Sequence, residues 1–154
     1  MTLTEEVKER IISILDSKEF MSDLYEGLSE KRRRELGMVY TPAKVCIKLI
    51  ESFECSTLAE RNILDPACGS GNLLIACLIA GADSDKVFGN EFDPVAVALC
   101  RRRVNRVCKL LGKPFIKEWQ IHEGDGTQAR CLTEFSPSYT FKQQEPGDLF
   151  SAFF

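Results

Sequence analysis

Asp65 to Asn72 is the segment of this sequence best suited to binding chemistry, and it reads Asp-Pro-Ala-Cys-Gly-Ser-Gly-Asn. It follows a short apolar run and precedes a helical one, which predicts a strand, a glycine turn and a helix. Gly69 and Gly71 have no Cβ atom, so the chain can turn tightly and bring backbone N–H groups close to a ligand. A phosphate loop would carry a lysine near the second glycine, and this segment has none. An acid beside a helix N-terminus instead suits a ligand with a cationic part and a carboxylate.

A second acid, Glu91, ends the next predicted strand, within Phe-Gly-Asn-Glu-Phe-Asp-Pro. An acid at this point can accept hydrogen bonds from both hydroxyls of a ribose. Phe92 beside it can cover a flat ring with its face. Asp93-Pro94 is more simply a helix start, with Asp as the N-cap and Pro at the first helical position.

The N-terminal part of the chain is predicted to be helical. Apolar residues at helical spacing cover residues 3–27, with a cap at Thr4 and a break near Ser17, and a short basic helix follows at 29–36. A further helix begins near Pro42, because proline costs little in a first turn. Its apolar face is predicted to consist of Val45, Cys46, Leu49, Ile50 and Phe53.

The following residues alternate between strand and helix patterns, which implies parallel βαβ units with right-handed crossovers. The predicted elements are strand 62–64, helix 70–81, strand 86–92, helix 94–111 and strand 115–122. From Gly126 onward the pattern weakens, and it indicates only a helix at 127–132 and a strand at 139–141.

Four separated segments, spanning Tyr40 to Gly126, carry a family resemblance, and one of them is Asp125 with its flanking glycines, where the family places an acid. Asp-Pro-Ala-Cys-Gly-Ser-Gly resembles the first motif of S-adenosylmethionine-dependent methyltransferases, in the form typical of adenine-N6 DNA methyltransferases. Glu91 with Asp-Pro resembles the second motif, and Val39-Tyr-Thr-Pro42 resembles the motif that precedes the first strand. This motif order resembles the gamma arrangement found in modification subunits of restriction systems.

The resemblance implies an α/β fold. We expect a partial Rossmann-like methyltransferase sheet of parallel strands 1–3 with flanking helices, preceded by an N-terminal helical segment. Residues 1–37 would form that segment, 38–127 the S-adenosylmethionine-binding core, and 128–154 an irregular tail of the same domain.

The resemblance also assigns roles in binding S-adenosylmethionine. Tyr40 would pack beside the methionine part and Thr41 would hydrogen-bond its carboxylate, while Glu91 would hold the ribose. Asp125 would accept a hydrogen bond from the adenine amino group, although a plain Asp-Gly turn is the alternative there. The expected cofactor-binding residues are Tyr40, Thr41, Asp65, Ala67, Gly69, Gly71, Asn72, Glu91, Phe92, Asp125 and Gly126.

The acceptor half of the chemistry is not evident. The family orients the target amino group with Asn/Asp-Pro-Pro-Tyr/Phe, whose aromatic ring stacks on the flipped base, and this sequence has no Asn-Pro-Pro-Tyr. The nearest segment is Ser136-Pro-Ser-Tyr139, so Ser136 and Tyr139 are the candidate catalytic residues. An ordinary Ser-Pro turn is the alternative. His122 is interpreted as a strand-end residue, since it has no evident catalytic partner.

Contacts with other molecules are predicted from charge and from the sheet. Lys31–Arg34 and the basic residues of helix 94–111 could contact DNA phosphates or form solvated helix faces. In that helix they are Arg101, Arg102, Arg103, Arg106 and Lys109. DNA recognition would come through these clusters or a partner chain. Loss of later strands would expose an edge of the first strand, which predicts a homo-oligomer or a hetero-complex.

The composition limits the classes of protein to which this chain can belong. With 154 residues, 44% hydrophobic and 28% charged, the chain can form one folded domain. A net charge of −3 argues against nonspecific nucleic-acid binding over the whole surface. Seven cysteines with one histidine and no Cys-x-x-Cys pair argue against a zinc site. Without a secretory signal or a membrane-length apolar run, we expect a cytoplasmic protein with reduced thiols and no membrane association.

We therefore expect an S-adenosylmethionine-binding protein that resembles a site-specific DNA adenine-N6 methyltransferase of restriction-modification or phage type, apparently truncated. The first alternative is a non-catalytic cofactor-binding or regulatory subunit of a modification complex. The second is a methyltransferase that acts on RNA or protein, which the first motif alone does not distinguish.

Overall fold

The N-terminal helices form as the apolar spacing predicts. The computed structural model describes residues 1–27, 29–35, 37 and 39–125. Its first helices are α1 (Glu5–Leu15), α2 (Lys18–Gly27), α3 (Glu30–Glu35) and α4 (Ala43–Glu51). The Thr4 side chain accepts a hydrogen bond from the Val7 N–H at 3.3 Å, which confirms the predicted cap. The predicted break is confirmed too, because the Ser17 hydroxyl accepts from the Phe20 N–H at 3.2 Å and so begins a new helix.

Within the described ranges, three short parallel strands form the sheet, in the order β1-β2-β3. They are β1 (Ile63–Asp65), β2 (Val87–Glu91) and β3 (Ile121–Glu123). Helix α5 (Asn72–Ile79) and the 3-10 turn η1 (Ser84–Lys86) connect β1 to β2, while α6 (Pro94–Leu111) and the 3-10 turn η2 (Glu118–Gln120) connect β2 to β3. This arrangement confirms the predicted α/β fold with parallel strands and flanking helices.

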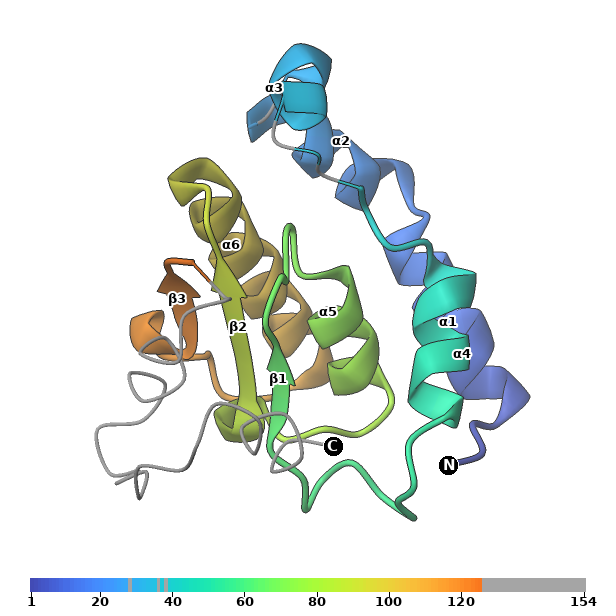
Figure 1. Cartoon of the computed structure of the whole chain (residues 1–154). Helices are drawn as coiled ribbons and strands as arrows, with labels where there is room; N and C mark the ends of the chain where they lie inside the picture. The colour runs from blue at the N-terminus through green and yellow to red at the C-terminus, as the bar shows by residue number, and fades with distance from the viewer. Residues whose placement is uncertain (28, 36, 38, 126–154) are drawn as a thin grey trace.

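Helix α5 lies at the centre of the packing. It contacts α1 and α4 on one side, α6 on the other, and both β1 and β2 (Figure 1). Its sequence, Asn-Leu-Leu-Ile-Ala-Cys-Leu-Ile, is apolar on every face because every face meets a neighbour. Every residue from Leu74 to Ile79 is buried, so the core surrounds this helix.

The predicted apolar face of α4 is partly wrong. Cys46 and Ile50 are buried as expected, but Val45 and Leu49 are 43% and 40% exposed. The helix packs on α1 and α5 through the i, i+3, i+4, i+7 set that starts at its first residue. That set consists of Ala43, Cys46, Ile47 and Ile50.

The third strand is shorter than predicted. Only Ile121–Glu123 pair with β2, and Glu118–Gln120 form the turn η2 instead. The buried Gln120 amide explains the difference, since its Nε2 donates to the carbonyl oxygens of Ser84 and Val87 at 2.7 and 2.9 Å. Its Oε1 accepts from the Lys117 N–H at 2.7 Å, which closes the turn ahead of the strand. These side-chain bonds replace strand pairing.

Some predictions concern residues outside the described ranges. The helix at 127–132 and the strand at 139–141 both lie there. The boundaries proposed for the segments 1–37, 38–127 and 128–154 also stay predictions. Across the described part of the chain, no helix combines the length and apolar character needed to cross a membrane.

Candidate functional site

The residues after β1 form the predicted glycine turn. The Asp65 Oδ1 accepts from the Ala67 N–H at 3.1 Å, which starts the turn at the strand's last residue. Gly69 and Gly71 have φ angles of 52° and 87°, in the region that other residues rarely adopt. The Cys68 N–H donates to the Asn90 carbonyl of β2 at 2.9 Å. The turn is therefore fixed against the second strand.

Glu91 joins the second strand to this turn. Its Oε2 accepts from the Gly69 N–H at 3.0 Å, and its Oε1 accepts from the Asp93 N–H at 3.1 Å. Each carboxylate oxygen keeps further acceptor capacity, because an ionised carboxylate has about four acceptor positions. The carboxylate is thus held in a fixed orientation at the carboxyl end of β2, half-buried and able to accept hydrogen bonds from a ligand.

The two acids give the site a negative character. Burial raises the pKa of the Asp65 carboxyl above its usual range, the bond from Ala67 opposes this, and the charge of Glu91 raises it further. A carboxylate whose ionisation is resisted in this way gains from a cation placed beside it. The electrostatics therefore favour a ligand with a positive group.

Gly71, the second glycine of the turn, packs against α6. A Cβ atom on Gly71 would lie 2.7 Å from the Cys100 Sγ and 3.3 Å from the Val104 Cγ2. Gly71 is buried against α6, so its missing side chain is needed for packing against that helix. The ligand role that the sequence interpretation gave to both glycines stays a prediction.

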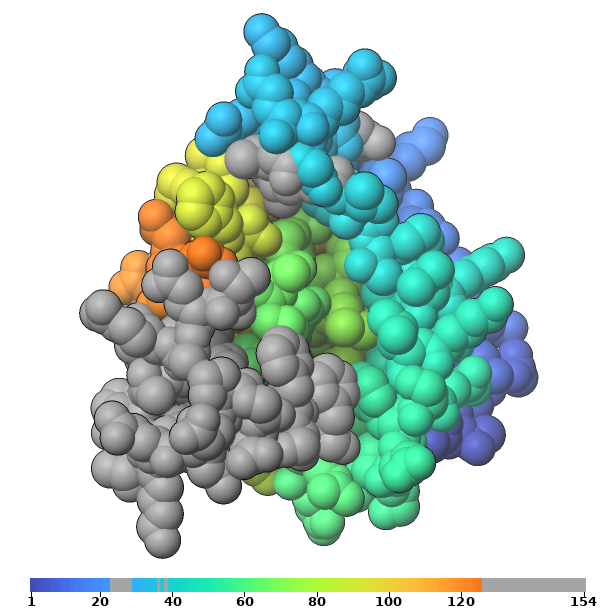
Figure 2. Space-filling view, viewed as in Figure 1, coloured from blue at the N-terminus to red at the C-terminus, as the bar shows by residue number. Residues whose placement is uncertain are grey.

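The segment that precedes α4 reaches the start of α5. The Asn72 Nδ2 donates to the Thr41 carbonyl at 2.9 Å, which brings the Tyr40–Thr41 segment beside the glycine turn. Tyr40 is half-buried, and the Arg33 guanidinium lies 5.5 Å from its ring centroid. Figure 2 shows a recess in the surface over β1 and α5, between this segment and the ends of β2 and β3. The Thr41 segment and the glycine turn are therefore neighbours in the folded chain.

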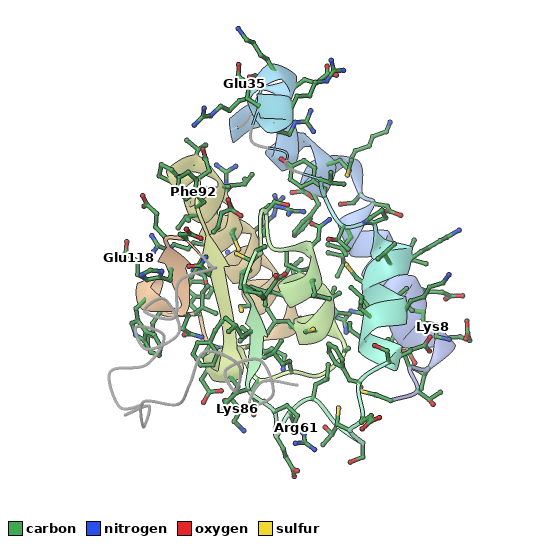
Figure 3. The ribbon with its side chains drawn as sticks, viewed as in Figure 1. Lys8, Glu35, Arg61, Lys86, Phe92 and Glu118 are labelled. Carbon is green, nitrogen blue, oxygen red and sulfur yellow. The ribbon has the colours of Figure 1, made fainter. Side chains whose placement is uncertain are left out.

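Phe92 and Asp125 complete the described part of the predicted site. Phe92 is 70% exposed and lies where β2 ends and α6 begins (Figure 3). Asp125 is half-buried and follows β3. Gly126 and the candidate catalytic residues Ser136 and Tyr139 lie outside the described residues.

Asn90 lies beside the candidate site, and the sequence interpretation did not single it out. It is buried, and its Nδ2 donates to the carbonyl of Pro66 at 3.3 Å and to that of Gly124 at 2.9 Å. It thereby joins the segments that follow β1 and β3. Its Oδ1 lies 3.0 Å from the His122 Nδ1, which agrees with the structural interpretation of that histidine. A polar amide near the end of an otherwise apolar strand was the available signal.

Several arginines of α6 hold the fold together. Arg103 is fully buried and donates to the Ser70 carbonyl at 2.7 Å. Arg101 donates to the Ile121 carbonyl at 2.7 Å, and Arg106 pairs with Glu19 of α2. The solvated-face interpretation is therefore wrong for Arg103. Arg102 and Lys109, by contrast, are exposed.

Asp93 is the N-cap of α6, as predicted. Its Oδ1 accepts from the N–H groups of Val95 and Ala96 at 2.9 and 3.1 Å, and its Oδ2 pairs with Arg32 of α3 at 3.2 Å. We expect Asp93→Ala to lower the free energy of unfolding by about 2 kcal/mol, because a cap is worth about 1 kcal/mol and the buried N–H groups lose their acceptor. Urea unfolding measures this, with Asp93→Ser retaining most of the stability. Equal losses for both variants would contradict the capping role.

The parallel sheet with its flanking helices is a partial Rossmann-like fold of the methyltransferase kind. The sequence model of the family described as N-6 DNA Methylase matches residues 16–109, and the chain belongs to this family. The resemblance inferred from the motifs is thereby confirmed.

Two curated relatives are type II methyltransferases. The chain is 32% identical over 109 residues to M.VspI of Vibrio sp. (strain 343), covering 66% of this chain and 26% of that protein. It is 30% identical over 79 residues to M.CvrRI of Paramecium bursaria Chlorella virus XZ-6E, covering 51% of this chain and 20% of that protein. The chain thus spans only a fifth to a quarter of the length of these relatives. No solved structure matches it.

Proposed function

We propose that this chain binds S-adenosylmethionine at the carboxyl ends of β1 and β2 and forms the cofactor half of an adenine-N6 DNA methyltransferase. The observation that carries the proposal is the Glu91 carboxylate, which two backbone N–H groups hold at 3.0 and 3.1 Å beside the glycine turn. Family membership supports the cofactor, since N-6 DNA methylases generally use S-adenosylmethionine. The type II relatives support a role in DNA modification. A cytoplasmic location is part of the same proposal.

The donor and acceptor set fits this cofactor. The remaining lone pairs of Glu91 suit the ribose hydroxyls, and the exposed Phe92 ring beside it suits the adenine face. Asp65 supplies negative charge for the cationic methionine end, and Thr41 lies next to the same turn. When bound, the cofactor supplies an electrophilic methyl group on a sulfonium. The residues of this chain would bind and orient it.

Calorimetric titration tests this proposal. We expect one-to-one binding of S-adenosylmethionine, competition by S-adenosylhomocysteine, and no competition by ATP, whose phosphates the two acids repel. A folded chain that gives no heat with either adenosyl compound would end the proposal.

The alternative is a non-catalytic binding subunit of a modification complex. It is favoured by the short coverage of the relatives and by the lack of Asn-Pro-Pro-Tyr in the sequence. Transfer of a labelled methyl group to unmethylated DNA distinguishes the two proposals. If the parent transfers the methyl group and Ser136→Ala does not, Ser136 belongs to the motif that binds the target amino group. If the chain binds the cofactor but transfers no methyl group, it is the non-catalytic subunit.

A partner chain, or a second copy, belongs to either version of the proposal. Among the described residues β1 is an edge strand, since the sheet order is β1-β2-β3. DNA contact would come through the partner or through basic residues such as Lys31 and Arg102, which are exposed. Gel filtration with light scattering is expected to show a species larger than a monomer, and a monomer would count against self-association.

Asp65→Asn is expected to change stability and binding in opposite directions. The pKa of Asp65 is higher in the folded chain than in the unfolded chain. Ionisation of Asp65 therefore lowers the stability at pH values above the folded pKa and has no effect at pH values below the unfolded pKa. The amide keeps an oxygen for Ala67, so the variant should be more stable than the parent at neutral pH, with the difference vanishing in acid. Affinity for S-adenosylmethionine should fall about tenfold, because a charged partner is lost. Denaturant unfolding at two pH values and titration measure both effects, with the exposed Asp85→Asn as control.

A further inference from the structure

Arg103 fixes the orientation of the Asn72 amide. Its Nη1 donates to the Ser70 carbonyl at 2.7 Å and to the Asn72 Oδ1 at 2.8 Å. An arginine side chain has donors and no acceptor, so the oxygen end of the amide must face it. The NH₂ end of Asn72 therefore points away from α6.

The NH₂ end of that amide holds the segment before α4. The Asn72 Nδ2 donates to the Thr41 carbonyl at 2.9 Å. Arg103 is fully buried and Asn72 is 8% exposed, so water competes little for these bonds. A chain of hydrogen bonds thus runs from Arg103 of α6, through Asn72 at the start of α5, to the carbonyl of Thr41.

The guanidinium is itself held in place by a second helix. It lies 5.4 Å from the ring centroid of Phe20 in α2, and Arg106 lies 5.1 Å from the same ring. Phe20 is buried. The hydrogen-bond chain therefore starts from a position that the core determines.

We propose that Asn72 and Arg103 are positioning residues that dock the Tyr40–Thr41 segment onto the glycine turn and so set the affinity for the amino-acid end of the cofactor. The Thr41 carbonyl also accepts a weak hydrogen bond from the Cys46 thiol, at 3.8 Å. The Asn72 amide is therefore the stronger of these two contacts to the Thr41 carbonyl, and Asn72 can affect cofactor affinity through it without contacting the ligand. This inference rests on the proposed function.

Asn72→Asp separates docking from packing. A carboxylate at this position keeps an acceptor for Arg103, but it replaces the donor that faces the Thr41 carbonyl with a repelling oxygen. Two ligands report the result: S-adenosylhomocysteine has the amino-acid end, and 5′-methylthioadenosine lacks it. We expect affinity for the first to fall at least about tenfold and affinity for the second to stay within about twofold.

A ligand-free readout and controls accompany the titrations. Amide hydrogen exchange over residues 41–46 should speed up in Asn72→Asp, while exchange in β2 should not change. Asn72→Ser, too short to span both partners, should behave in the same way. Asn105→Asp is the matched control, because that side chain uses its Oδ1 to accept from the Ile116 N–H at 2.9 Å.

The outcomes distinguish the inference from the proposed function. Equal weakening of both ligands, or unchanged exchange at 41–46, would overturn the positioning role alone. Failure of the parent to bind either ligand would overturn the proposed function, while faster exchange in Asn72→Asp would still support docking. If neither Asn72→Asp nor Asn72→Ser folds, the inference is contradicted, because it predicts only a local release of the Tyr40–Thr41 segment.

Discussion

Glu91→Ala is expected to abolish measurable binding of S-adenosylmethionine. The variant loses the acceptor proposed for two ribose hydroxyls, and hydrogen bonds to a charged group are worth about 1.5–3 kcal/mol each. Affinity should therefore fall at least about 100-fold. The variant also leaves the N–H groups of Gly69 and Asp93 without the acceptor they have at 3.0 and 3.1 Å. The free energy of unfolding should fall by about 2 kcal/mol.

The neighbouring strand provides the control for this variant. Glu123 pairs in register with Glu91, ends β3, and is exposed. Glu123→Ala should leave both affinity and stability close to those of the parent. Titration at a temperature where all three proteins are folded separates the binding effect from the stability effect. Glu91→Ala binding as tightly as Glu123→Ala would contradict the ribose role.

Gly71→Ala should cause the largest loss of stability. The new Cβ would lie 2.7 Å from the Cys100 Sγ, and the φ angle of 87° disfavours any side chain. The backbone costs about 1–2 kcal/mol and overpacking a further 1–3 kcal/mol, so we expect a total of about 3–4 kcal/mol. For a chain of this size the midpoint of thermal unfolding should fall by roughly 10 °C.

Gly112→Ala is the matched control for Gly71→Ala. Gly112 ends α6 with a φ of 65°, and a Cβ atom there would meet nothing within 4 Å. It should lose only the backbone term, about 1 kcal/mol. Cys100→Ala should restore part of the stability of Gly71→Ala in a double-mutant cycle, because it removes the nearest atom. Equal losses of stability in Gly71→Ala and Gly112→Ala would show that the contact with α6 does not destabilise Gly71→Ala.

Local signals explain what could be predicted from the sequence. Helix α6 begins at Pro94 after the Asp93 cap and ends before Gly112, and these signals lie at its ends. The glycine turn was also visible, because its residues are contiguous. The family followed from motifs that are each a few residues long, and residues 16–109 match it.

Contacts between distant segments explain what could not be predicted. Arg103 is in a basic run that looks solvated, and it is buried because Ser70 and Asn72 lie beside it only in the folded chain. Gln120 shortens β3 through carbonyls of residues 84 and 87. The close contact of Gly71 with Cys100 and Val104 of α6 arises for the same kind of reason. The roles assigned to Tyr40, Glu91 and Asp125 in cofactor binding stay predictions.

Backbone NMR of the chain with S-adenosylhomocysteine tests the central claim most directly, because it shows both whether and where the ligand binds. We expect the amide resonances of Gly69 and of residues 90–93 to shift saturably, while those of α1, on the far side of α5, stay in place. Glu91→Ala should remove the shifts. Saturable shifts confined to other parts of the chain, or no shifts at millimolar ligand, would contradict a cofactor site at the carboxyl ends of β1 and β2.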